Sequence, residues 1–245
     1  MSELSLGPAP AGAVARFQRL SLLGGVGVVA GMAWFLLLPG VSPLAHAHRG
    51  TWGLEALALS TAAWFVMMVA MMLPPVVPWL LVVASGAGRP SGAFLFAGGY
   101  FAVWLGYSFA AAAVQVGLQA MGVLGHDLAL QATAGGAVLI GAGLFQLSPL
   151  KDACLAHCRN PLSYFLRSWR DGPVGAFRMG AAHGVFCVGC CWALMAVALA
   201  LGVMNLLWMA ALTGMLILEK NAPGGRQMGT ALGWILIVWG GFLVV

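Results

Sequence analysis

Seven apolar runs, each long enough to cross a lipid bilayer as a helix, occupy most of this 245-residue chain. A crossing helix needs about 17 to 25 residues. The runs cover residues 20–38, 56–84, 92–119, 129–149, 180–201, 203–219 and 228–245. Only 7% of the residues are charged, against roughly a quarter in a soluble domain. We therefore predict an all-α polytopic membrane protein, a bundle of seven transmembrane helices with the lipid bilayer as its solvent.

Two of these runs depart from a simple span. The run 56–84 is too long for one straight crossing, and Pro74, Pro75 and Pro78 predict that it kinks or ends there. The run 203–219 follows the previous one after Gly202 alone, which predicts a tight hairpin or a partly re-entrant segment. Between the fourth and fifth runs, a proline start and apolar residues at helical spacing predict a short cytoplasmic interfacial helix over 161–171.

The basic residues indicate how the chain is oriented. Ten of the 11 lie in connections on one side of the membrane, and only Arg49 lies on the other. The positive-inside rule then places the N-terminus in the cytoplasm and the C-terminus outside, in a bacterial inner membrane. Residues 1–19 would be a cytoplasmic tail and 20–245 a single transmembrane domain. Residues 45–47 resemble a signal-peptide cleavage site, but the first apolar run is longer than a usual signal core, so cleavage stays open.

One candidate metal cluster lies in the fifth run: His183, Cys187, Cys190 and Cys191. In a helix these side chains share an arc of about 100° on one face. They extend over about 12 Å along the helix axis, so one ion can bind only a subset of them. Any single site must therefore be completed by residues from elsewhere in the chain.

A second cluster, Cys154, His157 and Cys158, precedes the interfacial helix, and its cysteines are i, i+4 neighbours if the segment is helical. The two clusters contain all five cysteines of the chain. Both fall in the cytoplasmic half of the predicted topology, where thiols stay reduced, which favours metal ligation over disulfides. Each cysteine taken alone is equally typical of a small buried hydrophobe.

Thioethers in the second run add soft donors: Met67, Met68, Met71 and Met72. Such donors suit monovalent copper, and the scarcity of acidic residues disfavours hard cations. A methionine stripe at helical spacing is also typical of adaptable core packing, so this alternative stays open. Cysteine and histidine suit zinc as well as copper.

Four further residues are weaker candidates. His46 and His48 offer two imidazoles for an outer metal site. Glu219 and Lys220 end the sixth run, where Glu219 forms an ion pair with a nearby cation or gates access to the cysteines.

Several functions are excluded or disfavoured. The basic residues form no stripe that could follow phosphates, so we expect no nucleic acid partner. Both lysines lie at span ends, which leaves no residue for a retinal Schiff base, and the span centres carry no carboxylate for proton pumping. The chain also lacks the common hydrolase, phosphate-loop and zinc-protease motifs, so we do not expect an enzyme.

The chain resembles a family of predicted metal-binding integral membrane proteins that includes copper chaperones of bacterial polyphenol oxidases of the tyrosinase type. The resemblance covers the second to sixth runs and rests on four segments: Trp64-x-x-Met67-Met68-x-Ala70-Met71-Met72-x-Pro74, Leu150-Lys151-x-x-Cys154-Leu155-x-x-Cys158-Arg159-x-Pro161, Gly180-x-x-x-Gly184-x-x-Cys187-x-Gly189-Cys190-Cys191-Trp192-x-Leu194-Met195, and Met204-Asn205-x-x-Trp208-Met209 followed by Glu219-Lys220. It implies copper handling, with a cuproenzyme such as a polyphenol oxidase as partner. It also makes the cysteines and matching methionines candidate ligands.

These observations together lead to one hypothesis and three alternatives. The hypothesis is a membrane copper chaperone or maturation factor that holds Cu(I) on Cys, Met and His ligands and supplies it to a cuproenzyme. The alternatives are a copper transporter or channel, a membrane thiol–disulfide oxidoreductase that exchanges its paired cysteines, and a structural subunit of a membrane complex. Metal stoichiometry, the receiving enzyme and the oligomeric state stay open.

Overall fold

The computed structural model describes residues 11–41, 53–86, 90–125, 128–203 and 205–245. Within these ranges the chain is all-helical and contains no β-strand. The nine described helices are α1 (Ala11–Leu36), α2 (Gly53–Gly86), α3 (Pro90–Ala120), α4 (Ala132–Gln146), α5 (Pro149–Cys158), α6 (Pro161–Ser168), α7 (Gly172–Leu201), α8 (Leu206–Asn221) and α9 (Gly225–Val244).

Five of the described helices, α1, α2, α3, α7 and α9, are long and apolar enough to cross a membrane. The predicted span 129–149 contains α4, which has only 15 residues, and α5 follows it after a bend of 65°. Ser148 accepts a hydrogen bond from the Lys151 backbone N–H and Pro149 occupies the first turn, so a new helix starts there. Counted as one bent span, this pair makes six candidates among the described residues.

The predicted span 203–219 corresponds to α8, which has 16 residues. Its length of about 24 Å is less than a hydrocarbon core of about 30 Å. The all-helical class is therefore confirmed, but the number of seven spans is not. The predicted interfacial segment 161–171 contains α6, which ends at Ser168 and packs Phe165 against Trp79 of α2.

Helix α2 continues through all three prolines over 34 residues instead of ending at them. Pro74 has no N–H to donate to the carbonyl of Ala70, four residues earlier. The Trp34 indole of α1 donates to that carbonyl instead, at 3.2 Å. A neighbouring helix thus satisfies the polar group that the proline leaves free, which is how apolar helices tolerate proline.

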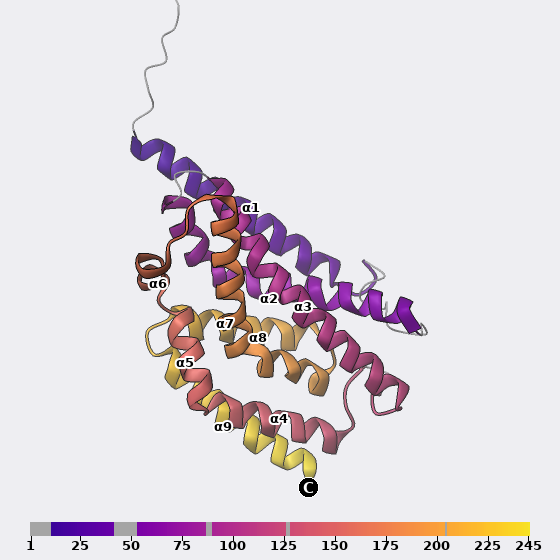
Figure 1. Cartoon of the computed structure of the whole chain (residues 1–245). Helices are drawn as coiled ribbons and strands as arrows, with labels where there is room; N and C mark the ends of the chain where they lie inside the picture. The colour runs from indigo at the N-terminus through magenta and orange to yellow at the C-terminus, as the bar shows by residue number, and fades with distance from the viewer. Residues whose placement is uncertain (1–10, 42–52, 87–89, 126–127, 204) are drawn as a thin grey trace, which may run out of the picture.

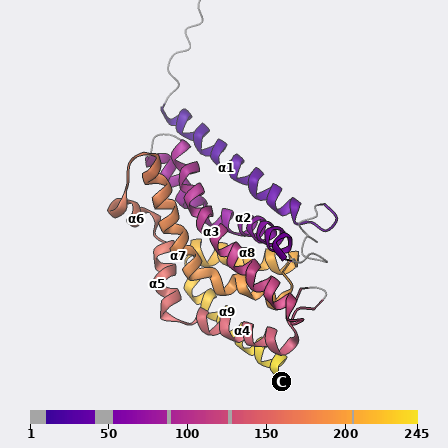
Figure 2. The same ribbon diagram turned by 45° about the vertical axis from the view of Figure 1, so that its right-hand side comes forward.

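The helices form a bundle with two different edges (Figures 1 and 2). Helix α1 lies along one edge, where it packs on α2, and the α4–α9 pair forms the opposite edge. Helices α2, α3, α7 and α8 lie between them. The cysteine-bearing helices α5 and α7 pack against each other, and α4 also packs on α7.

Glycines set the close approach of α4 and α9. A Cβ on Gly143 would lie 2.6 Å from the Gly233 carbonyl oxygen, and one on Gly136 would lie 2.7 Å from the Gly240 carbonyl oxygen. Real Cβ atoms do not approach backbone so closely, so these helices pack backbone to backbone. Small residues at helix interfaces allow this packing in lipid.

Replacing Gly143 by alanine should destabilise the α4–α9 pair, whereas replacing Gly141 should not. A Cβ on Gly141 meets nothing within 4 Å, and alanine favours a helix over glycine by about 1 kcal/mol. We expect Gly143→Ala to lower the unfolding temperature in detergent and Gly141→Ala to leave it unchanged or raise it. Equal melting of the two variants would contradict this packing.

Candidate metal centre

Three thiols converge where α5 meets α7. The Sγ atoms of Cys158, Cys187 and Cys190 all lie within 4.8 Å of one another, and they form the one such His, Cys, Asp or Glu group found in the described residues. The Cys158 and Cys190 sulfurs are 3.7 Å apart, and all three side chains are buried. Metal–thiolate bonds of ~2.3 Å place trigonal sulfur ligands ~4 Å apart. The group therefore has the dimensions of a site for one soft ion.

The helices explain this convergence. Cys187 and Cys190 are i, i+3 neighbours on α7, which puts them on one face. Cys158 is the last residue of α5, and its carbonyl oxygen accepts a hydrogen bond of 3.0 Å from the Trp79 indole of α2. This bond ties the end of α5 to α2, while α5 itself packs on α7.

Two polar groups from other helices contact the Cys187 sulfur. The Lys220 ammonium of α8 donates to it at 2.9 Å, and the Tyr100 hydroxyl of α3 lies 3.0 Å away. Both side chains are buried. A buried ammonium is costly without a counter-charge, and a thiolate, the metal-binding form of cysteine, supplies one. The centre thus combines soft ligands with a positive charge beside them.

Glu219 is adjacent to Lys220 in sequence but faces a different partner. Its carboxylate oxygen lies 2.6 Å from the Lys151 ammonium, and both side chains are buried. Gln146 also accepts a hydrogen bond from Lys151. On the α9 side, a Cβ at Gly229 would collide with the Glu219 carboxylate. The structure thus places Glu219 in an ion pair with Lys151, and a role in gating stays a prediction.

The two predicted histidines lie beside the thiol group but outside it. His183 is buried and stacks on Trp79 with ring centroids 3.7 Å apart, and its Nδ1 has no hydrogen-bond partner among the described residues. His157 stacks on Phe186 at 3.8 Å. Together with Phe96 and Tyr164, these rings form an aromatic wall next to the thiols.

The remaining cysteines lie close to the group without belonging to it. The Cys191 sulfur is 3.3 Å from that of Cys190. Cys154 is half-buried, with its sulfur against Gly189, where an added Cβ would lie 3.1 Å from it. All five cysteines are free thiols.

The predicted methionines divide into two pairs. Met67 and Met71 line a small cavity, whereas Met68 and Met72 are buried elsewhere in the core. The cavity also brings in Met195 of α7 and Met209 of α8, which the sequence offered only as matching methionines of the family resemblance. His46 and His48 lie outside the described residues.

Comparison with known proteins gives one family. The family model PpoB2, described as a copper chaperone, matches residues 61–243. No curated protein and no solved structure matches the chain. The match covers most of the chain, including both cysteine clusters, all four cavity methionines and Lys220, and it confirms the resemblance seen in the sequence. The chain belongs to the PpoB2 copper chaperone family.

Proposed function

We propose that this protein is a membrane copper chaperone that holds Cu(I) on Cys158, Cys187 and Cys190 and passes it to a cuproenzyme such as a polyphenol oxidase. The observation that carries the proposal is the meeting of three buried thiols beside a buried ammonium. Thiolates select soft ions such as Cu(I). In keeping with the distribution of basic residues, the protein would lie in a bacterial inner membrane with its N-terminus in the cytoplasm.

Lys220 helps to explain how a buried site can hold so much negative charge. Three thiolates around one monovalent ion leave two negative charges, of which the Lys220 ammonium offsets one. All three thiols are buried, and the attraction between opposite charges is stronger away from water.

Delivery would be ligand exchange. A thiol or imidazole of the receiving enzyme replaces one thiolate at a time, and the copper ion keeps its oxidation state throughout. No covalent bond of a substrate changes, so the proposed role is not that of an enzyme.

Metal analysis of the full chain tests this function. We expect the detergent-purified protein, loaded anaerobically with Cu(I), to retain copper through gel filtration, with sulfur neighbours in its X-ray absorption spectrum. Retention of zinc but not copper would overturn the copper assignment. A metal-free protein whose thiols cycle with a dithiol donor would instead identify an oxidoreductase, and copper uptake into proteoliposomes would identify a transporter.

A further inference from the structure

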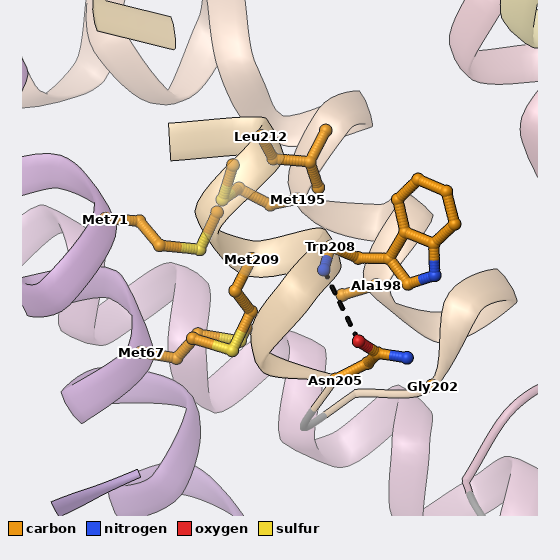
Figure 3. A pocket seen from close by; sticks show the side chains of 9 residues that line it. All are labelled: Met67, Met71, Met195, Ala198, Gly202, Asn205, Trp208, Met209 and Leu212. Atoms are coloured by element: carbon orange, nitrogen blue, oxygen red, sulfur yellow. Dashed lines mark hydrogen bonds between the residues drawn. The ribbon is translucent and has the colours of Figure 1, made fainter. Parts of the chain in front are cut away.

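We propose that Met67, Met71, Met195 and Met209 form a second Cu(I) site, built from thioethers alone. This inference deepens the proposed function, because it takes Cu(I) to be the cargo. The four methionines are among the nine residues that line one cavity, at a place distinct from the three-cysteine group. Figure 3 shows the side chains from α2 extending toward those from α7 and α8.

The first argument is the convergence of the side chains. Met67 and Met71 lie one turn apart on α2, Met195 comes from α7 and Met209 from α8. No two of these helices are consecutive in the chain except α7 and α8, so tertiary packing gathers the thioethers. Each of the four side chains is at most 2% exposed.

The second argument is the space between the side chains. The cavity has a volume of about 10 Å³, near the smallest volume that holds one water-sized sphere. A water there would need two to four polar partners. Among the described residues that line the cavity, only Asn205 and Trp208 have polar side chains. The Asn205 oxygen already accepts from the Leu207 and Trp208 backbone N–H groups.

The third argument is ligand chemistry. Thioether sulfur is a soft, neutral donor that suits Cu(I), and the lining contains no carboxylate or imidazole for a harder ion. A thioether has no proton to lose, so acid does not compete with the metal there. Thiolate sites, by contrast, weaken as the pH falls. The two sites would therefore differ in how they respond to acid.

The position of Met195 relates the two sites. It lies four residues after Cys191 on α7, about 6 Å along the axis and on the same face. Cys191 in turn lies 3.3 Å, sulfur to sulfur, from Cys190. Met195 is thus one helical turn from Cys191, and it lies farther toward the C-terminal end of α7 than Cys187 and Cys190.

Selenomethionine labelling separates the sites. In the Cys158→Ser, Cys187→Ser, Cys190→Ser variant, made with selenomethionine and loaded anaerobically with Cu(I), we expect one copper per chain and copper–selenium scattering at the copper edge. The labelled parent protein should hold two ions, and lowering the pH should release the thiolate-bound ion first.

The matched variants change only methionines. Met67→Leu with Met209→Leu should remove one of the two ions and abolish copper–selenium scattering. Met68→Leu with Met72→Leu alters buried methionines of α2 that do not line the cavity, and it should leave both unchanged. Exchange of methionine for leucine conserves volume and is well tolerated in cores, so the variants should fold.

The possible outcomes distinguish this proposal from the proposed function. Copper that disappears with the three cysteines and never shows selenium neighbours overturns the thioether site alone. Copper that survives in the serine variant with selenium neighbours supports the thioether site, even if the cysteines prove to bind none. A parent protein that holds no copper overturns both.

Discussion

Replacing Cys187 by serine should weaken Cu(I) binding at the three-thiol group about 100-fold or more, given that even changes to groups supporting a metal ligand cost 10- to 100-fold. The Cys187 sulfur lies within 4.8 Å of both other thiols and is also the atom that Lys220 and Tyr100 contact. Its loss removes one ligand and separates the remaining thiols from the compensating charge. Competition with a chromophoric Cu(I) chelator under anaerobic conditions measures the change.

Cys154→Ser is the matched control for this variant. Cys154 lies on the same helix as Cys158, but its sulfur is outside the group. Its replacement should change the affinity less than about threefold, within the scatter typical of surface substitutions. Serine at position 187 also leaves the Lys220 ammonium without its partner, so this variant changes two things at once. Cys190→Ser provides a second measurement, because Lys220 does not contact Cys190 directly. Unchanged affinity in both ligand variants would refute the three-thiol site.

The Lys151–Glu219 ion pair should dominate the stability of the α5–α8 contact. Removing one partner of a buried pair costs about 3–5 kcal/mol, because the other charge stays buried and unpaired. We therefore expect Lys151→Met to lower the unfolding free energy by about that amount. Unfolding in mixed detergent micelles, followed by circular dichroism, measures the difference.

Two further variants separate the effect of the unpaired buried charge on stability from the other effects of Lys151→Met. The double variant Lys151→Met, Glu219→Leu removes both charges and should recover most of the lost stability, since apolar pairs often replace buried ion pairs without cost. Arg226→Met breaks the exposed Arg226–Asp152 pair, also 2.6 Å long, and should cost less than about 1 kcal/mol. If Lys151→Met proved as mild as Arg226→Met, the buried pair would have no special role.

The lengths of the apolar runs predicted the helices well, but they predicted the breaks between helices less well. Runs of low charge identify lipid-sized helices because only a helix satisfies its backbone within apolar surroundings. The bend at Ser148 and Pro149 carried a recognisable local helix-start pattern, yet both residues were included at the end of an apolar run. The three prolines predicted a kink or an end in the second run, but α2 continues through them. Trp34, which is far away in sequence, donates to the carbonyl that one of these prolines leaves free.

The sequence predicted only those features of the candidate site that depend on residues sharing one face of a helix. The spacing of Cys187 and Cys190 on one face, and the need for a ligand from elsewhere, follow from helix geometry. The contacts of Lys220 and Tyr100 with Cys187 join residues 33 and 87 positions apart, so they depend on how whole helices rotate and cross. No local pattern encodes such angles.

The methionines show a second limit of prediction from the sequence, which is that similar neighbouring residues can have different surroundings. Met67 and Met68 look alike in the sequence, but only Met67 lines the cavity. Met195 lies one turn beyond Cys191 and could have been found by extending the cysteine face along the helix. Met209 had no such neighbour and was indicated by the family resemblance instead, since a buried methionine alone is typical of ordinary core packing.

Arg159 directly follows the thiol ligand Cys158, and its guanidinium donates to the carbonyl oxygens of Glu219 at 3.1 Å and Ala222 at 2.7 Å. These two acceptors flank Lys220 near the end of α8, where free carbonyls attract cations. The guanidinium therefore connects the end of α5 to the end of α8 through two hydrogen bonds. Because these bonds join the end of α5 to the end of α8, a displacement of Cys158 from the other two thiols would also move Lys220 away from Cys187.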